Sequence, residues 1–249
     1  MLYEHELELA MAAAKKAGGF LSLRKDVFMD SAEGKDIKLS SDKKSEKIII
    51  DVLEESEHPI LSEECGLIGS GDGLRWIVDP LDGTANYWRG LDELACVSVA
   101  LWKNDEPVLG VVYRFSLNEL YYGIVGEGAW LNGMPIYTSD IQKIKDATLV
   151  TGIPIKFDFE NGMKRHADNI SAFKKIRMLG TAATMGVLVG CGKADAYIED
   201  GIMLWDIAGS AAIVQAAGGS LDIKHEENIC ACKLFANKRL MEDYLDKIV

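Results

Sequence analysis

The chain has 249 residues, of which 48% are apolar and 27% charged, a composition typical of one large globular domain or two joined halves. Its formal net charge of −12 argues against a nucleic-acid-binding surface and against attachment to an anionic membrane. No run of residues predicts a membrane span, and Glu4, Glu6 and Glu8 interrupt any signal-peptide pattern. An anionic substrate would need a local positive centre, which a bound divalent cation can supply.

Cysteine usage predicts a reducing compartment. No Cys-x-x-Cys pair occurs, and the number of cysteines is odd. The five are Cys65, Cys96, Cys191, Cys230 and Cys232. We therefore expect reduced thiols and a cytoplasmic protein.

Two amphipathic helices are expected near the start of the chain. Residues 4–22 repeat apolar side chains at helical spacing, whereas the polar stretch 24–41 predicts a loop or an irregular hairpin. A second helix is expected to begin at Ser41 or Asp42, since either residue can cap it. Its apolar face consists of Ile48, Ile49, Val52 and Leu53.

From residue 59 to residue 131 the pattern becomes typical of strands. The expected strands are 59–62, 74–79, 95–102, 108–115, 118–125 and 128–131. Turn signals such as Asn104-Asp105 separate them. Short connections make the last four strands antiparallel neighbours.

The second half alternates between strands and helices. We expect strands at 147–151, 194–199, 219–223 and 233–236. We expect helices at 161–173, 181–191 and 205–217, and from Asn237 onward. Helices packed on mixed sheets, in two halves, give an α/β (α+β) fold class.

The strongest local signal is the segment from Trp76 to Tyr87. An apolar strand ends at Asp79 and Asp82, and Gly83-Thr84 follows. A strand end brings both carboxylates and a backbone carbonyl to one point, and these are the ligands Mg²⁺ prefers. Two carboxylates 4 Å apart repel by about 4 kcal/mol at an effective dielectric of 20, so burying them calls for a cation. The Gly-Thr turn can direct N–H groups at an anion.

Other acidic residues carry less information on their own. Glu64, beside Glu63, has the pattern of a solvated charge. Asp42 is explained by helix capping, and Asp206 by a favourable position in the first turn of a helix. Only the cluster of Asp79 and Asp82 indicates chemistry by itself.

Four ordered motifs resemble the inositol monophosphatase family of Mg²⁺-dependent, lithium-sensitive phosphatases. They are Ser62-Glu63-Glu64, Asp79 to Tyr87, Gly180-Thr181-Ala182-Ala183, and Ala194 to Gly209 followed by Ala216-Ala217-Gly218-Gly219. The resemblance implies a layered α-β-α-β-α sandwich of two mixed or antiparallel sheets. It also implies an N-terminal half (1–140) with most metal ligands and a C-terminal half (141–249) with Asp206 and the substrate residues, in one continuous globular unit.

The resemblance implies two bound Mg²⁺ ions. Glu63, Asp79 and the Leu81 carbonyl would hold the first. Asp79, Asp82 and Asp206 would hold the second. Asp79 would therefore bridge the two ions, an arrangement that clamps the attacking and leaving oxygens of a displacement.

Catalytic and substrate roles also follow from the resemblance. A metal-activated water, oriented by Glu63 and Thr84, would attack phosphorus. Asp42 would hydrogen-bond Thr84 and help to draw the proton, while the Gly83 and Thr84 N–H groups would bind the phosphate. Substrate hydroxyls would meet Asp82, Gly180, Ala182, Glu199 and Asp206. Glu199 is the best reader of a polyol, because a carboxylate accepts from adjacent hydroxyls.

One region departs from the family pattern. The family's Asp-x-x-Thr-x-x-Asp appears here as Asp36-x-x-Leu39-x-x-Asp42. Its mobile-loop lysine has no clear counterpart, although Lys35 and Lys38 are close in sequence. In terms of the resemblance, these departures alter the third metal position and the closure of the mobile loop. They leave the ligands of the two core metals intact.

The function expected from these motifs is hydrolysis of inositol monophosphate or a similar small polyol or sugar phosphate, by a homodimer. A 3′(2′),5′-bisphosphate nucleotidase (PAP phosphatase) or a fructose-1,6-bisphosphatase would share the chemistry. The nucleotidase branch usually resembles Asp-Gly-Thr-Lys-Glu-Phe, whereas Thr84 is followed here by Ala85-Asn86-Tyr87. A catalytically inactive metal-binding regulatory protein is disfavoured because every expected ligand is present. A serine or cysteine hydrolase is disfavoured because no Gly-x-Ser-x-Gly occurs.

Overall fold

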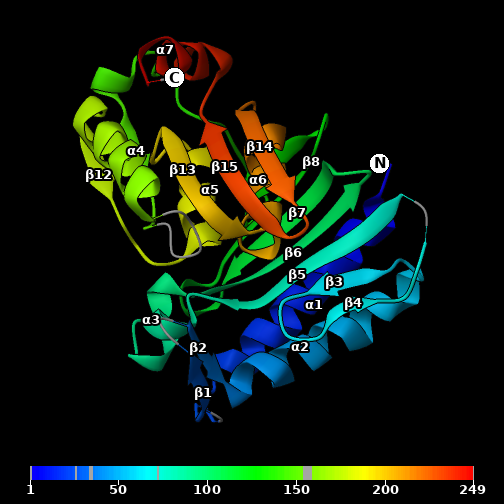
Figure 1. Ribbon diagram of the computed structural model, residues 1–249. Helices are drawn as coiled ribbons and strands as arrows, with labels where there is room; N and C mark the ends of the chain where they lie inside the picture. The colour runs from blue at the N-terminus through cyan, green and yellow to red at the C-terminus, as the bar shows by residue number, and fades with distance from the viewer. Residues whose placement is uncertain (1, 26, 34–35, 72, 154–158, 249) are drawn as a thin grey trace.

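The computed structural model describes residues 2–25, 27–33, 36–71, 73–153 and 159–248. The two larger sheets alternate with three layers of helices, so the expected layered sandwich is confirmed (Figure 1). Lys35, named above with Lys38, lies outside the described residues.

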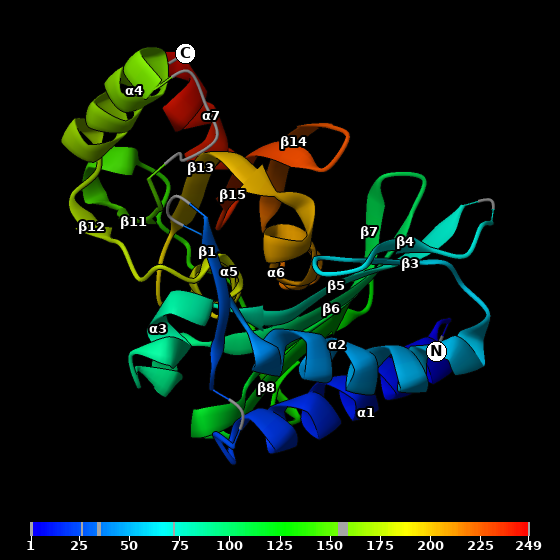
Figure 2. The same cartoon turned by 60° about the horizontal axis from the view of Figure 1, so that its bottom comes forward.

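The first layer is a pair of helices, α1 (Glu4–Leu21) and α2 (Ser40–Leu53). Figure 2 shows them side by side beneath the large sheet. α1 packs closely because its inner face is made of small, fully buried residues: Ala10, Ala13, Ala14 and Ala17. The segment between the helices forms a hairpin of β1 (Met29–Glu33) and β2 (Asp36–Leu39), as one of the two predicted alternatives had it.

The start of α2 differs from the prediction. The helix begins at Ser40 and its N-cap is Leu39. Asp42 is the third helical residue, and its Oδ2 accepts the Leu39 N–H at 2.7 Å. It therefore satisfies the helix end from inside the first turn, whereas the prediction placed the cap at Ser41 or Asp42. Ile48, expected on the buried face, is half-buried.

The large sheet has eight strands in the order β10-β9-β8-β7-β6-β5-β3-β4. In that order they span Met134–Ile136, Gly128–Leu131, Glu119–Ile124, Glu106–Arg114, Cys96–Lys103, Leu74–Asp82, Ile60–Ser62 and Gly66–Ile68. β6 to β9 are antiparallel neighbours, as predicted. β3 runs parallel to β5, which brings the ends of these two strands to the same edge.

The second sheet has five strands in the order β12-β11-β13-β15-β14. They span Lys175–Arg177, Thr148–Val150, Ala196–Met203, Ile229–Phe235 and Ser220–Glu226. Helices α5 (Ala182–Gly190) and α6 (Leu204–Ala216) form the middle layer between the two sheets. Helices α4 (Phe159–Ala172) and α7 (Lys238–Ile248) lie at the far side of the second sheet (Figure 1). The short helix α3 spans Thr84–Trp88, and one-turn 3₁₀ helices span Glu54–Ser56, Asp92–Leu94, Phe115–Leu117 and Ile144–Asp146.

Helix α6 approaches the large sheet through two glycines. A Cβ on Gly110 of β7 would lie 2.1 Å from the Gly209 carbonyl oxygen, and a Cβ on Gly209 would lie 2.5 Å from Ser98 Oγ. Real side-chain carbons do not come this close to an oxygen, so both positions require glycine. The contact sets the distance between the sheet and α6, whose first turn carries Asp206. Among the described residues, no helix combines the length and the apolar character needed to cross a bilayer.

Substitution Gly110→Ala is expected to lower the free energy of unfolding by about 1 to 3 kcal/mol, because the new methyl group overpacks the interface with α6. Gly19→Ala in α1 is the matched control. No atom lies within 4 Å of its added Cβ, and alanine should stabilise the helix by about 0.5 to 1 kcal/mol. Urea unfolding of the three proteins measures both effects. Equal stability of Gly110→Ala and the natural chain would contradict the packing argument.

Candidate functional site

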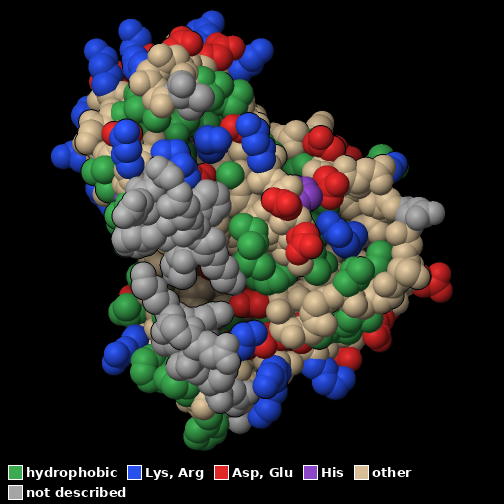
Figure 3. Space-filling view, in the orientation of Figure 1, with side chains coloured by type: hydrophobic (Ala, Val, Ile, Leu, Met, Phe, Trp, Pro, Cys, Tyr) green, Lys and Arg blue, Asp and Glu red, His purple; other side chains and the backbone are tan. Residues whose placement is uncertain are grey.

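The predicted site residues meet in one cavity of about 530 Å³ between the large sheet and the C-terminal half. Ten of the expected residues line it: Glu63, Asp79, Leu81, Asp82, Gly83, Thr84, Gly180, Ala182, Glu199 and Asp206. In the space-filling view acidic side chains lie near the middle of this face, between its upper and lower parts (Figure 3). Asp42 does not line the cavity and lies behind it, buried in α2.

Strand pairing explains why Glu63 and Asp79 are neighbours. Ser62 pairs with Val78, and the Glu63 N–H donates to the Val78 carbonyl at 3.3 Å. The two acidic residues therefore leave adjacent parallel strands at the same edge. Their charges interact, since Glu63 is among the causes that raise the pKa of Asp79.

Asp79 is the most enclosed carboxylate of the group, with 1% of its surface exposed. Its Oδ1 accepts the Leu81 N–H at 2.9 Å. Burial raises the pKa of this carboxyl well above its usual range, and the charges of Glu63, Asp82 and Asp206 raise it further. An ionised Asp79 therefore needs a cation beside it.

Asp82 is anchored to the other half of the molecule. Its Oδ2 accepts the Thr181 hydroxyl at 2.5 Å and the Ala183 N–H at 2.8 Å, and its Oδ1 accepts the Ala182 N–H at 3.2 Å. These donors form the N-terminus of α5, which favours an anion. Burial still raises the pKa of Asp82, so the hydrogen bonds offset only part of the desolvation. The role of Thr181 lies within the third motif but was not singled out from the sequence.

Asp206 is the third residue of α6, and its Oδ2 accepts the Met203 N–H at 3.3 Å. Burial raises its pKa well above the usual range, followed by the charges of Glu63 and Asp82. The simple reading of Asp206 as a residue favoured by the helix dipole is therefore incomplete. Its carboxylate also faces two other acids across the cavity.

Asp42 and Thr84 do not hydrogen-bond in this structure. The Thr84 hydroxyl donates to the Leu81 carbonyl at 2.9 Å. Asp42 Oδ1 is buried without a hydrogen-bond partner, and burial raises the pKa of Asp42 to about 7. The contact expected between the two side chains is therefore absent here, and the proton-drawing role of Asp42 stays a prediction.

Gly83 gives the chain its turn into α3. It has φ of 85°, and a Cβ there would lie 2.4 Å from the Leu94 carbonyl oxygen. Only glycine fits this left-handed and crowded position. The turn places the first N–H groups of α3 at the cavity wall, where helix geometry leaves them no acceptor within the helix. The predicted phosphate cradle is consistent with this arrangement.

Glu199 lies at the opposite side of the cavity, on β13. Its Oε2 accepts the Tyr197 hydroxyl at 2.9 Å, and burial raises its pKa to about 7. Gly152 packs against it so closely that a Cβ there would lie 2.2 Å from Oε2. Glu199 is thus a partly buried acid whose side chain is fixed by these contacts, and not a mobile surface charge.

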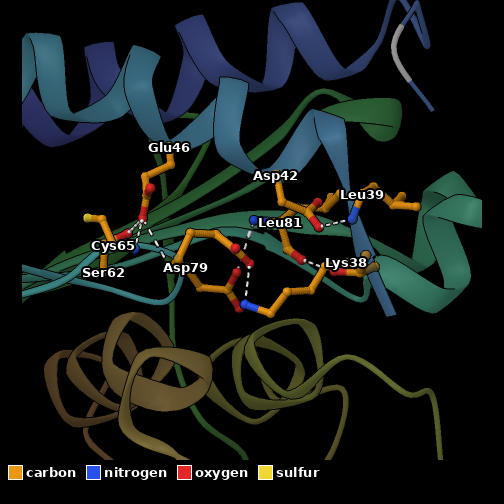
Figure 4. Close-up of polar contacts among 10 residues, drawn as sticks. Lys38, Leu39, Asp42, Glu46, Ser62, Cys65, Asp79 and Leu81 are labelled. Atoms are coloured by element: carbon orange, nitrogen blue, oxygen red, sulfur yellow. Dashed lines mark hydrogen bonds and ion pairs between the residues drawn. The ribbon is translucent and has the colours of Figure 1, made fainter. Parts of the chain in front are cut away.

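The sequence did not point to Glu46, which holds the turn around Glu63 in place. From α2, its Oε1 accepts the Ser62 hydroxyl and, at 3.1 Å each, the N–H groups of Glu64 and Cys65 (Figure 4). Glu46 is 7% exposed. Its position on the inner face of α2, four residues after Asp42, is the only signal that could have indicated it.

The donor set fits a hard divalent cation. It consists of carboxylate and carbonyl oxygens that line the cavity. Across the ranges that the structure describes, no three His, Cys, Asp or Glu side chains converge closely enough to form a finished metal site. Burial, and after it the neighbouring negative charges, raise the pKa values of Asp79 and Asp206, so these acids favour the protonated form unless a cation compensates them.

The inositol monophosphatase family matches residues 2–243. The "Nus factor SuhB" of Pasteurella multocida (strain Pm70) is 33% identical over 254 residues, covering 97% of this chain and 95% of that protein. The "Fructose-1,6-bisphosphatase/inositol-1-monophosphatase" of Aquifex aeolicus (strain VF5) is 33% identical over 248 residues, covering 96% and 93%. A solved structure of inositol monophosphatase from Anabaena (Nostoc) sp. PCC 7120 superposes with a TM-score of 0.86 at 28% identity, covering 100% of this chain and 96% of that one.

The chain belongs to the inositol monophosphatase family. The resemblance to this family, inferred from the motifs, is thereby confirmed, and membership supports a phosphatase. The relatives carry different activity names, so membership alone leaves the substrate of this chain open.

Stability is expected to depend on pH and Mg²⁺ together. Burial raises the pKa of Asp42 from 3.8, and that of Glu199 from 4.5, to about 7. At pH values between the ordinary and the raised pKa of these groups, the folded, metal-free chain holds more protons than the unfolded chain. Its stability therefore falls as the pH rises through this range. Mg²⁺ should restore stability most at the upper end, where the ligands ionise most readily. Thermal unfolding across this range, with Mg²⁺ and with EDTA, tests this expectation. A Mg²⁺-induced rise in Tm that is the same at every pH would count against it.

Proposed function

We propose that the protein is a Mg²⁺-dependent phosphomonoesterase that hydrolyses inositol monophosphate or a similar small polyol phosphate. The observation that carries the proposal is the meeting of Asp79, Asp82 and Asp206, with raised pKa values, in one cavity beside the Gly83 turn. Such acids need divalent cations, and the turn offers N–H groups to an anion.

The residues that would hold the cations are Glu63, Asp79 and the Leu81 carbonyl on one side, and Asp79, Asp82 and Asp206 on the other. Bound Mg²⁺ supplies a water of lowered pKa and neutralises the charge of the phosphate. Asp82 Oδ1 has one hydrogen bond, at 3.2 Å, so it keeps lone-pair capacity for a cation. The Leu81 carbonyl accepts one hydroxyl and likewise keeps a lone pair.

The other residues bind and orient. The N–H groups of Gly83 and Thr84 hold the phosphate oxygens, and Glu63 and Thr84 orient the attacking water. For this role the Thr84 hydroxyl would turn from the Leu81 carbonyl, to which it donates here, toward the unpartnered Asp42 Oδ1. Asp42 would then receive the proton drawn from the water through Thr84. No covalent phosphoenzyme is formed, because water attacks directly.

The leaving-group side of the cavity favours a neutral polyol. Glu199 and Asp206 accept hydrogen bonds from hydroxyl groups, while Gly180 and Ala182 shape the wall. None of the described residues that line the cavity is Lys or Arg. Among these described lining residues, a second phosphate, as in fructose 1,6-bisphosphate or PAP, would meet carboxylates and no cation. This favours inositol monophosphate among the alternatives.

Several finer features stay predictions: two Mg²⁺ ions, with a third position altered, inhibition by lithium, a homodimer, and a cytoplasmic location. The division into halves at residue 140 also stays a prediction. A regulatory role is the second candidate, because a relative is named a Nus factor. A regulatory role does not require catalysis, so the phosphate-release assay described below distinguishes the two candidates.

Asp79→Asn is expected to abolish phosphate release, because it removes the carboxylate proposed to hold both cations. Turnover should fall by more than about 100-fold, since even residues behind a metal ligand contribute about 10- to 100-fold. The substrate panel contains inositol 1-phosphate, PAP, fructose 1,6-bisphosphate and histidinol phosphate, each with and without lithium.

Asp51→Asn is the matched control for that experiment, because Asp51 is exposed on α2 and pairs with Lys47. It should behave like the natural chain. In EDTA at neutral pH, Asp79→Asn should unfold at a higher temperature, because it removes a buried carboxyl whose ionisation burial opposes. Near-normal turnover in Asp79→Asn would refute the two-metal proposal. No turnover by the natural chain on any ester would favour the regulatory candidate.

Glu199→Gln is expected to change substrate preference. It keeps the shape of the side chain and removes a charged acceptor, so KM for inositol 1-phosphate should rise about 10-fold. The rate with p-nitrophenyl phosphate, which has no polyol, and the affinity for Mn²⁺ should change little. Glu226→Gln, at an exposed position of β14, is the control. An equal loss on both esters would contradict the proposed role.

A further inference from the structure

The altered hairpin sends a lysine toward the acidic cluster. Lys38 lies on β2, and its Nζ is 3.0 Å from Glu64 Oε1. The Glu64 side chain is only 5% exposed, so this ion pair is not an ordinary surface contact. Figure 4 shows the Lys38 side chain extending from β2 toward the carboxylates around Asp79.

The charge of the Lys38 ammonium also acts on Asp42. Burial raises the pKa of Asp42, the charges of Glu63 and Glu64 raise it further, and the charge of Lys38 lowers it. Asp42 is 3% exposed, and its Oδ1 has no hydrogen-bond partner. Lys38 therefore lies among acidic groups, because it pairs with Glu64 and its charge also acts on Asp42.

The neighbouring residues show why this geometry is specific to Lys38. Leu39 follows it and points the other way, fully buried in the core beneath α1 and α2. Alternation along a strand thus directs residue 38 toward the site and residue 39 away from it. Leu39 offers no side-chain oxygen, so this part of the hairpin supplies a positive charge in place of a metal ligand.

We propose that the Lys38 ammonium is a built-in cation of the site, which neutralises the Asp42 and Glu64 side of the cluster and so competes with divalent ions there. The proposal rests on the proposed function, in which Glu63 and Asp79 hold the divalent cations beside this region. A tethered ammonium is present at every Mg²⁺ concentration, and as a compact point charge it repels a further cation. The chain therefore binds fewer divalent ions, or binds the last one more weakly, than its carboxylates alone would allow.

The test measures binding of Mn²⁺ to the metal-free, full-length protein by calorimetry and by electron paramagnetic resonance. The proteins are the natural chain, Lys38→Met, Lys38→Gln and Lys47→Met. Lys47 is the matched control, because it is an exposed lysine of α2 that pairs with Asp51. Both Lys38 variants should bind more Mn²⁺ at a given free concentration. Their weakest site should tighten by about fivefold or more, the effect of removing one unit charge a few ångströms away. Lys47→Met should match the natural chain.

Stability provides a second readout. Without metal, the Lys38 variants should unfold at a lower temperature than the natural chain, because Asp42 and Glu64 lose their neutralising partner. Mn²⁺ should then raise their Tm by more than it raises that of the natural chain. Lys38→Gln keeps a polar end should Lys38→Met fold poorly.

Isotherms that are unchanged, or weaker, in both Lys38 variants would overturn the proposal and reduce Lys38 to a structural ion pair. Mn²⁺ binding is read without any substrate. Failure of the natural chain to hydrolyse phosphate esters would therefore refute the proposed function alone, and the role of Lys38 would still be decided by the isotherms.

Discussion

Crowding of carboxylates at one edge of the large sheet is the constraint on which the site depends. Parallel pairing of β3 with β5 brings Glu63 to Asp79, and the first turn of α6 adds Asp206. Burial raises the pKa values of Asp79 and Asp206, and the charges of the neighbouring acids raise them further. The fold holds them together because the cores on both faces of the sheet are large, and a cation can turn this repulsion into binding.

Much of this arrangement is readable in the sequence. The run Trp76-Ile77-Val78 is fully buried, as its composition indicates, and it leads directly to Asp79. The long helices and the antiparallel strands β6 to β9 follow from their periodicity. Their signals are strong because each element is long enough to show a face. The family motifs also predict that Asp206, although distant in sequence, belongs to the same site, and in the structure it lines the same cavity.

What the sequence does not show is local or depends on tertiary contacts. β4, β10 and β12 have three residues each, too few to display alternation. Ser41 or Asp42 was expected to cap α2, but the helix begins at Ser40 with Leu39 as its N-cap, so Asp42 is the third helical residue. Glu46 resembles any polar residue of a helix, and only the packing of α2 on the turn after β3 reveals that it holds three donors. Likewise, only the structure of the β1–β2 hairpin shows that Lys38 lies beside Glu64.

The anchoring of Asp82 makes the site visible to spectroscopy. Its carboxylate accepts the backbone N–H groups of Ala182 and Ala183, which belong to the first turn of α5. The chemical shift of an amide proton follows the charge on its acceptor. These two resonances therefore report directly on the ionisation and occupancy of the cavity, without a label or a substrate. They are buried backbone signals in a well-packed helix, and so can be followed even in variants that no longer turn over.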